Sequence, residues 1–393
     1  MKRVAVLGGG PAGSFAAERL ARAGLDTVLF DEKLAWEKPC GGGLTYKAWH
    51  EYPFLIENDT PKKLITRTNI TAPKAGTASL DLPQALLVYS RFDLNKMLLK
   101  RAESAGAHLE KTRVLALERK ENGWKVRTRN GIVEADYCVI ATGARNPLRE
   151  VGTEWAPGDT ATALGYYATG QQDHIDIQFL PGLEGYIWVF PRCGHLSVGI
   201  CGKNQSAQTM RSQLERYMEE HSLPYKGAKF YGHVLPSLGR QAWRRNRIAG
   251  DRWMAVGDAA GLVDPITGEG LYYAMRSGDL ASQTILDDAC APEVKAAAYR
   301  TTLHEDFVAD LEFGSLLAGR VYSSQFMFSS VPARMVQFTR GSPRFLALMQ
   351  DLFAGTQSYL GLKSRLLGGL HRSPGGSLLG FFLNRLIPSG DAA

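Results

Sequence analysis

A glycine-rich string near the N-terminus constrains the fold more than any other feature of the chain. Residues Gly8–Gly13 read GGGPAG and fit the pattern G-x-G-x-x-G. The string follows the short apolar run 3–7 and leads into residues 14–23, whose apolar positions recur at helical spacing. A second β-branched run, 26–31, comes next. In such a string the first glycine permits a tight turn, the second lets backbone approach a pyrophosphate, and the third allows close helix–strand packing. The sequence therefore predicts a dinucleotide-binding βαβ unit.

An acidic residue stands where such a unit binds ribose. Asp31 ends the second run, 18 positions after Gly13, and its carboxylate can accept hydrogen bonds from ribose hydroxyls. Glu32 is its neighbour and a second candidate, although we expect its side chain to point out of the strand. The contacts predicted for this unit are Gly8, Gly10, Pro11, Ala12, Gly13, Asp31 and Glu32.

A second nucleotide motif lies far along the chain. The apolar run Trp253–Val256 ends in Gly257-Asp258 and enters a helix, which would place a carboxylate against a ribityl chain or a second ribose. The following segment contains glycines that would let main chain approach a flat ring. One motif alone suits NAD or FAD equally, whereas two motifs favour a permanently bound FAD. The contacts predicted here are Gly257, Asp258, Pro265, Gly268, Gly270 and Leu271.

The remaining periodicities indicate an α/β fold with α+β elements. Apolar patterns predict a helix over 92–105, a hairpin of 113–119 with 124–129, a strand over 137–141, a sheet-rich layer over 160–200, a helix over 270–286, and mainly helix from 295 onward, interrupted at Pro332, Pro343, Pro374 and Pro388. We expect a Rossmann-like FAD-binding domain assembled from 1–160 and 240–295, with 36–90 partly on the substrate side. An antiparallel-sheet substrate domain would take 161–239 and a helical C-terminal region 296–393.

These motifs together resemble the FAD-dependent oxidoreductases of the para-hydroxybenzoate-hydroxylase fold, over about residues 1–290. The resemblance rests on the N-terminal unit, Arg91 ahead of a helix, Ala141-Thr142-Gly143-Ala144, Gly257-Asp258 and Gly268-Glu269-Gly270. It adds five positions to the predicted FAD contacts, namely Arg91, Val114, Ala141, Thr142 and Gly143.

Two further segments resemble the geranylgeranyl reductases within that fold. Lys38–Leu44 is similar to their P-C-G-G segment, and Gly185–Pro191 is similar to their Y-x-W-x-F-P motif with its following glycine pair. Here Gly199 is present, but Cys201 stands where the second glycine is expected. The first segment adds Cys40, Gly41 and Gly42 to the predicted flavin contacts, because three glycines after Cys40 would leave the flavin face open.

Four residues of these segments are the predicted catalytic group: Cys40, Tyr186, Trp188 and Phe190. Cys40 is either a redox or proton-handling thiol or a small buried residue, and the sequence leaves both interpretations open. The three aromatic residues alternate and so project from one strand face. They line either an apolar cavity or an ordinary sheet core, and the resemblance favours the cavity.

The resemblance implies reduction of C=C bonds in a polyprenyl or other hydrophobic substrate by reduced FAD. The chain has no second G-x-G-x-x-G fingerprint that could serve as a dedicated site for a nicotinamide cofactor. We therefore expect the electron donor, which is NADPH, NADH or a protein, to dock transiently. One alternative is a flavin-dependent monooxygenase or halogenase acting on an aromatic or hydrophobic molecule. Against it, Ala141-Thr142-Gly143 lacks the Asp-Gly of the hydroxylases, and no W-x-W-x-I-P string occurs. Another alternative is an electron-transfer flavoprotein that passes electrons to quinone.

Charge and cysteine content bear on the compartment and the partners. The formal net charge is +7, and most of the excess lies after residue 315, where basic side chains either contact anionic lipid or form a solvated helical surface. Five cysteines without a C-x-x-C pair argue against a disulfide scaffold or zinc site. The eight histidines show no metal-ligand spacing. We expect a cytoplasmic protein, peripheral at the inner membrane face, with no bound metal or nucleic acid and an oligomeric state that is not predicted.

Overall fold

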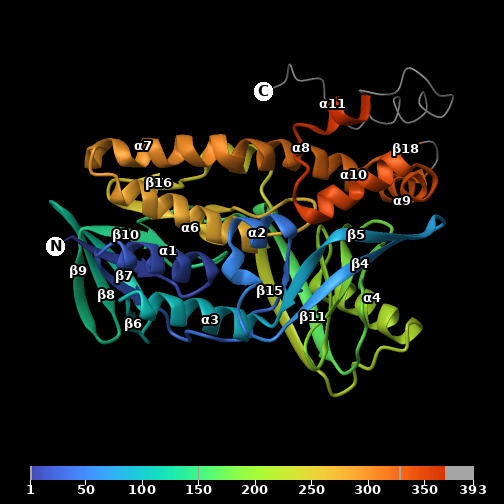
Figure 1. Cartoon of the computed structure of the whole chain (residues 1–393), viewed down its shortest axis with the longest axis horizontal. Coiled ribbons are helices and arrows are strands. Elements are labelled where there is room, and N and C mark those ends of the chain that lie inside the picture. Colours follow the sequence, from blue (N-terminus) through green and yellow to red (C-terminus); the bar gives the residue numbers. More distant parts are fainter. Residues whose placement is uncertain (1, 149, 327–328, 368–393) are drawn as a thin grey trace.

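The chain folds around two large sheets that lie side by side, with helices above and below them (Figure 1). The computed structural model describes residues 2–148, 150–326 and 329–367. The helices are α1 (Pro11–Arg22), α2 (Tyr46–Glu51), α3 (Arg91–Ser104), α4 (Ala207–Glu220), α5 (Arg240–Arg245), α6 (Leu271–Leu286), α7 (Pro292–Leu303), α8 (Ala309–Ser323), α9 (Val331–Gly341), α10 (Pro343–Ala354) and α11 (Leu362–Leu367). This mixed architecture confirms the predicted fold class.

The six-stranded sheet contains the predicted βαβ unit. Its order is β16 (Ala249–Gly250), β17 (Trp253–Ala255), β10 (Tyr137–Ile140), β1 (Arg3–Leu7), β2 (Asp26–Phe30) and β6 (His108–Glu110). All pairs are parallel except β16 with β17. Helix α1 joins β1 to β2 and packs against α3 and α6. The strands predicted over 3–7, 26–31, 137–141 and 253–256 are therefore confirmed, within one residue at their ends.

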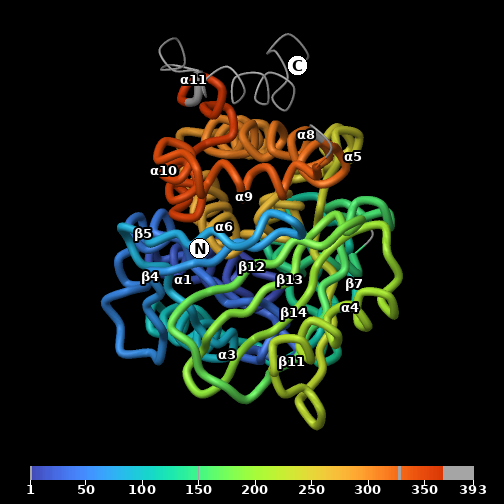
Figure 2. The backbone as a smooth tube through the Cα atoms, turned by 90° about the vertical axis from the view of Figure 1, so that its right-hand side faces the viewer, coloured from blue at the N-terminus to red at the C-terminus, as the bar shows by residue number. Residues whose placement is uncertain are grey.

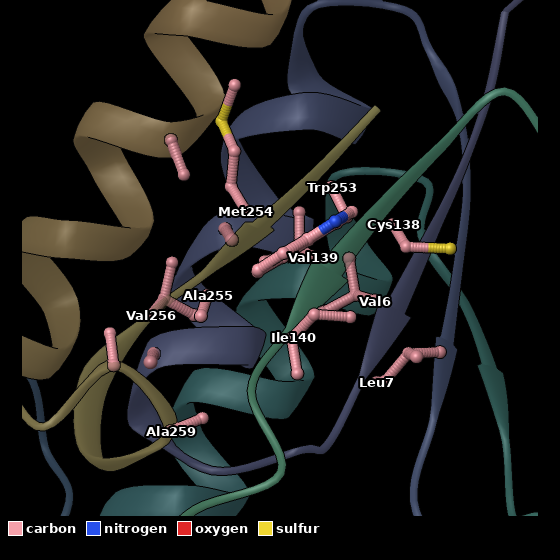
Figure 3. Close-up of a cluster of buried hydrophobic side chains, with 14 of the residues drawn as sticks. Val6, Leu7, Cys138, Val139, Ile140, Trp253, Met254, Ala255, Val256 and Ala259 are labelled. Carbon is pink, nitrogen blue, oxygen red and sulfur yellow. The ribbon is translucent and has the colours of Figure 1, made fainter. Parts of the chain in front are cut away.

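An apolar core holds these strands together (Figure 3). Val6 and Leu7 of β1, Val139 and Ile140 of β10, and Met254 of β17 are almost completely buried. Strands buried on both faces explain why these segments are continuous apolar runs rather than alternating ones. Since parallel strands end at the same edge of a sheet, the loops that follow β1, β2, β10 and β17 gather along one edge. That edge carries the nucleotide motifs.

A small three-stranded sheet lies beside this sheet. It contains β7 (Val114–Lys120), β8 (Gly123–Thr128) and β9 (Gly131–Ala135), all antiparallel. The predicted hairpin is confirmed, and β9 is a third strand that the sequence pattern did not reveal.

The eight-stranded sheet is the second large layer. Its order is β15 (Lys229–Pro236), β11 (Thr160–Ala168), β14 (Leu196–Lys203), β13 (Glu184–Pro191), β12 (Ile175–Phe179), β4 (Lys62–Ala72), β5 (Gly76–Tyr89) and β3 (Gly43–Leu44). The sheet-rich layer expected over 160–200 is present. The long β4–β5 hairpin was not predicted, and it joins this sheet through the parallel pairing of β12 with β4.

Helices cover both faces of the eight-stranded sheet. Met210, Leu214 and Met218 of α4 pack on one face against buried residues of β13 and β14. Helices α9 and α10 lie over the opposite side, where they contact β4 and β5 (Figure 2). Pro332 and Pro343 begin α9 and α10 instead of interrupting a helix, because a proline fits the first turn. The other two predicted breaks, Pro374 and Pro388, lie outside the described residues. Within the described part of the chain, no helix has the length and apolarity needed to cross a membrane.

Candidate active site

One cavity of about 640 Å³ joins the nucleotide edge of the six-stranded sheet to the eight-stranded sheet and the C-terminal helices. Its polar end is formed by Pro11, Lys38, Cys40–Gly43, Arg91, Asp258 and Gly268–Leu271, and its apolar end by side chains that include Ile177, Trp188, Val321, Phe345 and Met349. Predicted cofactor residues and predicted substrate residues therefore line the same space.

The glycines of the N-terminal motif have the geometry that a bound pyrophosphate requires. Gly8 has φ +117°, and a Cβ there would lie 2.2 Å from the carbonyl oxygen of Ala141. A Cβ at Gly13 would lie 1.9 Å from the carbonyl oxygen of Gly8, so this position packs too tightly for any side chain. At Gly10, by contrast, a Cβ would meet nothing within 4 Å. Gly10 also caps α1, whose free N-terminal N–H groups and positive dipole end suit a phosphate.

Other predicted contacts lie along the sheet edge, outside the cavity. The carboxylate of Asp31 accepts from the N–H of Gly9 at 2.7 Å and so braces the glycine loop. Residues 141–143 follow β10, and Gly257 packs close to Ala12 of α1. Three predicted contacts do not join this set. Glu32 is exposed and pairs with Arg129 at 3.0 Å, Val114 begins β7, and Pro265 packs toward Gly314 of α8.

A cluster of charged groups forms the polar wall of the cavity. The Nζ of Lys38 lies 2.9 Å from Oδ2 of Asp258. Burial opposes the charged form of Asp258, but Lys38 beside it holds the pKa of this carboxyl below its ordinary value. Burial and then the charge of Lys38 lower the pKa of His233, on β15, to about 4. The buried nitrogens Nε of Arg91 and Nε2 of His233 have no hydrogen-bond partner. Unpartnered polar atoms and the open space at Gly10 fit a bound dinucleotide.

The loop that carries Cys40 is held from two sides. Arg192, after β13, donates to the carbonyl oxygens of Cys40 and of Gly41 and forms an ion pair with Glu37. Ser197 also donates to the carbonyl oxygen of Cys40, at 3.0 Å. On the other side, Glu37 accepts from the N–H groups of Arg91 and Phe92, at the start of α3. Cys40 therefore lies between the cofactor wall and the substrate sheet.

The glycines after Cys40 have a packing role that sequence reasoning missed. Built Cβ atoms at Gly41 and Gly43 would lie 3.1 and 2.7 Å from the ring of Phe190. At Gly42, where φ is +87°, a Cβ would lie 2.0 Å from the carbonyl oxygen of Tyr89. The loop is glycine-rich at least partly because Phe190 and β5 press against it.

The aromatic residues of β13 face the cavity together. Tyr186, Trp188 and Phe190 all line it, as expected for alternate residues of a strand. Trp188 lies over Gly199 of the neighbouring strand, where a Cβ would come within 2.2 Å of the indole ring. Cys201 pairs with Tyr186 in the β13–β14 register and also lines the cavity. The departure from the expected glycine pair therefore adds a side chain to the cavity wall, while the position that receives Trp188 keeps its glycine.

The apolar end of the cavity is completed by residues that the sequence did not identify. Helix α8 contributes Leu317 and Val321, and α10 contributes Leu348, Met349 and Leu352. Their helical spacing signals a buried face, but it does not say which surface that face covers. The sequence also did not reveal three polar site residues, because the groups that they contact are far away in the sequence. These residues are Lys38, His233 and Arg192.

Comparisons with known proteins agree with this geometry. A family model described as pyridine nucleotide-disulphide oxidoreductase matches residues 2–167. The chloroplastic geranylgeranyl diphosphate reductase of Oryza sativa subsp. japonica is 31% identical over 72% of this chain and 66% of its own length. Digeranylgeranylglycerophospholipid reductase 2 of Methanopyrus kandleri is 27% identical over 81% of this chain and 86% of its own.

Solved structures give the same result for the fold. A geranylgeranyl bacteriochlorophyll reductase-like protein from Thermoplasma acidophilum is 26% identical, covers 90% of this chain and all of its own, and has a TM-score of 0.68. A myxobacterial chondrochloren halogenase, 18% identical over 91% of this chain and 98% of its own, has a TM-score of 0.65 and shows the fold alone. From the cavity and these likenesses together, the chain belongs to the geranylgeranyl reductase family of FAD-dependent oxidoreductases.

Proposed function

We propose that the protein reduces C=C bonds of a prenyl chain or another hydrophobic substrate at its FAD. The observation that carries this proposal is the continuity of the cavity, which runs from the cofactor wall at Asp258 to the apolar end around Trp188 and Met349. A site for a small polar substrate would not need so long an apolar wall.

Bound FAD would supply the hydride, and this chain would supply binding, orientation and exclusion of water. The N-terminus of α1 and the glycine loop would hold the pyrophosphate, and Arg91 and Asp258 lie where the cavity meets that loop. An isolated alkene is a poor electrophile, so it must be held closely against the flavin in a dry space. The apolar residues of β12, β13, α8 and α10 would form that space.

The second alkene carbon must receive a proton from a group in the cavity. We assign proton handling to Cys40, whose Sγ accepts from the N–H of Gly42 at 3.3 Å. Tyr186 is a poor acid here, because burial raises its pKa well above its ordinary value. Glu269 is a competing donor, since burial raises the pKa of its carboxyl to about 7 and it lines the same cavity.

We also propose that NADPH, NADH or a protein donor reduces the flavin by transient docking.

The division into domains is also a proposal. It comprises a discontinuous FAD-binding domain (1–160 and 240–295), a sheet-rich substrate domain (161–239) and a helical C-terminal region. Limited proteolysis with mass mapping of the fragments tests this division.

A peripheral contact with anionic membranes would deliver a hydrophobic substrate. The basic residues proposed for it are Arg340, Arg344, Lys363 and Arg365. Arg340 already donates to the carbonyl oxygen of Ala75, and Arg365 pairs with Asp351. Charge reversal at the four positions should weaken binding to anionic vesicles, most strongly at low salt. If the wild-type protein does not bind such vesicles at low ionic strength, the proposed membrane contact is wrong.

The central experiment uses dithionite-reduced protein without oxygen, incubated with geranylgeranyl diphosphate and, separately, geranylgeraniol. Mass spectrometry should detect products that have gained two hydrogen atoms for each reduced bond. Rapid formation of a flavin hydroperoxide in air, with an oxygenated or halogenated product, would support a monooxygenase or halogenase instead. Fast quinone reduction without alkene reduction would support an electron carrier.

A further inference from the structure

Three tyrosine hydroxyls from separate parts of the chain meet on one short loop of the cavity wall. The loop, residues 264–269, links the Gly257-Asp258 turn to α6. Tyr322 of α8 donates to the carbonyl oxygen of Ile266 at 2.7 Å, and Tyr186 of β13 donates to that of Thr267. Tyr359, between α10 and α11, donates to the carboxylate of Asp264 at 2.8 Å. Two of the three tyrosines therefore come from the C-terminal region.

Asp264 is the centre of the hydrogen bonds within the 264–269 loop. Its carboxylate accepts from the N–H groups of Ile266 and Thr267, both at 2.8 Å. The N–H of Asp264 donates to the carbonyl oxygen of Glu269, and the N–H of Gly268 donates back to the carbonyl oxygen of Asp264. Because these bonds close the loop on itself, a shift at Asp264 would carry Gly268 and Glu269 with it, and both residues line the cavity.

Tyr359 and Tyr322 also line the cavity with their own side chains. Tyr359 is 5% exposed, and its ring packs where a Cβ at Gly314 would come within 2.8 Å. The N–H of the next residue, Leu360, donates to Asp310 of α8 at 2.9 Å. A ligand in the apolar end of the cavity would therefore contact rings whose hydroxyls are bonded to the loop beside the cofactor wall.

We propose that Tyr322 and Tyr359 are positioning residues that hold the 264–269 loop, and that through this loop a prenyl ligand strengthens FAD binding. The proposal rests on the proposed function, because it requires both ligands to share the cavity. A ligand packed against the two rings restricts them and so favours the loop conformation in which they are bonded. By linkage, FAD must strengthen binding of the prenyl ligand by the same factor.

The experiment measures the dissociation constant of FAD with and without saturating geranylgeraniol, by titration of flavin fluorescence. Wild-type protein should bind FAD roughly fivefold or more tightly in its presence. Tyr359→Phe and Tyr322→Phe remove one oxygen each and keep the ring, and each should bring this ratio toward one. Tyr217→Phe, on α4 at the other face of the eight-stranded sheet, is the matched control and should keep the wild-type ratio.

The outcomes separate the two proposals. Wild-type protein that binds FAD and geranylgeraniol without any coupling would overturn the positioning role, as would coupling that survives in both cavity variants. Wild-type protein that binds no FAD or no prenyl alcohol would overturn the proposed function itself. Tyr359→Phe removes a hydrogen bond from the buried carboxylate of Asp264 and could therefore fail to fold. In that case Tyr322→Phe still tests the proposal, because it removes a donor only from the backbone carbonyl of Ile266.

Discussion

Arg192 and Glu37 form an ion pair across two parts of the molecule that are 155 residues apart in the sequence, with Arg192 buried and Glu37 half-buried. Arg192 is 1% exposed, and its remaining donors bind the backbone of the Cys40 loop. Burial disfavours the charged form of Glu37, but Arg192 and the N–H groups of Phe92 and Arg91 hold its pKa below the ordinary value. The ion pair thereby ties the loop to the start of α3.

Removal of both partners should cost less stability than the two single removals added together. Arg192→Met leaves the half-buried carboxylate of Glu37 without its cationic partner and should lower the free energy of unfolding by about 1–3 kcal/mol. The double variant Arg192→Met/Glu37→Gln should lose less than the sum of the two single changes, because no charge stays unpaired. Chemical denaturation of the four proteins measures this cycle. Strictly additive losses would show that the two side chains do not interact.

Two glycines of the N-terminal motif should respond differently to substitution. Gly10→Val places a branched side chain in open space next to the helix N-terminus, so the protein should fold and lose FAD. Gly13→Ala forces a Cβ against the carbonyl oxygen of Gly8, so it should reduce stability itself. Absorbance at flavin wavelengths and thermal melts of both variants give the two readouts. A Gly10→Val protein that retains stoichiometric FAD would contradict the assignment of this loop to the pyrophosphate.

Local patterns predicted the parts of the fold that depend on neighbouring residues. The strands of the six-stranded sheet and the glycine turn were predictable, because apolar runs and glycine spacing are properties of short segments. The contact of Arg192 with the Cys40 loop and that of Tyr359 with Asp264 were not, since each joins residues about a hundred or more positions apart. Likewise, the apolar faces of α8 and α10 could be predicted, but not that they close the cavity. The proposed domain boundaries stay predictions.

The half-buried imidazole of His233 should make stability depend on pH. Its pKa of about 4 lies below the unfolded value of about 6.5, so between these values the unfolded chain binds a proton that the folded chain does not. The contribution is complete above about pH 6.5 and is lost as pH falls toward 4. His233→Gln should therefore flatten the decline in unfolding free energy on acidification, by at most about 3 kcal/mol.

Thermal or chemical unfolding of wild type and His233→Gln across this pH range makes the comparison. The matched control is His304→Gln, at an exposed position of the segment between α7 and α8, which should keep the wild-type pH profile. Parallel profiles for wild type and His233→Gln would show that this imidazole is protonated equally in the folded and unfolded states.

Cys40 and Trp188 should affect alkene reduction without removing the cofactor. Cys40→Ala should keep FAD and lose most turnover, or change how many double bonds are reduced, because it removes the proposed proton-handling thiol. Trp188→Ala should leave reduction of the flavin nearly intact and impair reduction of the prenyl chain, because it removes part of the apolar wall. Single-turnover kinetics separate the two half-reactions, and mass spectrometry counts the reduced bonds.

Loss of packing is the competing explanation for Trp188→Ala. The indole is 6% exposed, and truncation of a buried tryptophan costs roughly 3–5 kcal/mol. Melting curves with FAD bound must therefore accompany the kinetics, and Trp188→Phe should recover much of both stability and alkene reduction because it restores an aromatic wall. If Cys40→Ala and Trp188→Ala stay folded and reduce the prenyl substrate at the wild-type rate and extent, neither residue serves the reaction. The Cys40 loop and strand β13 would then support the fold rather than the chemistry.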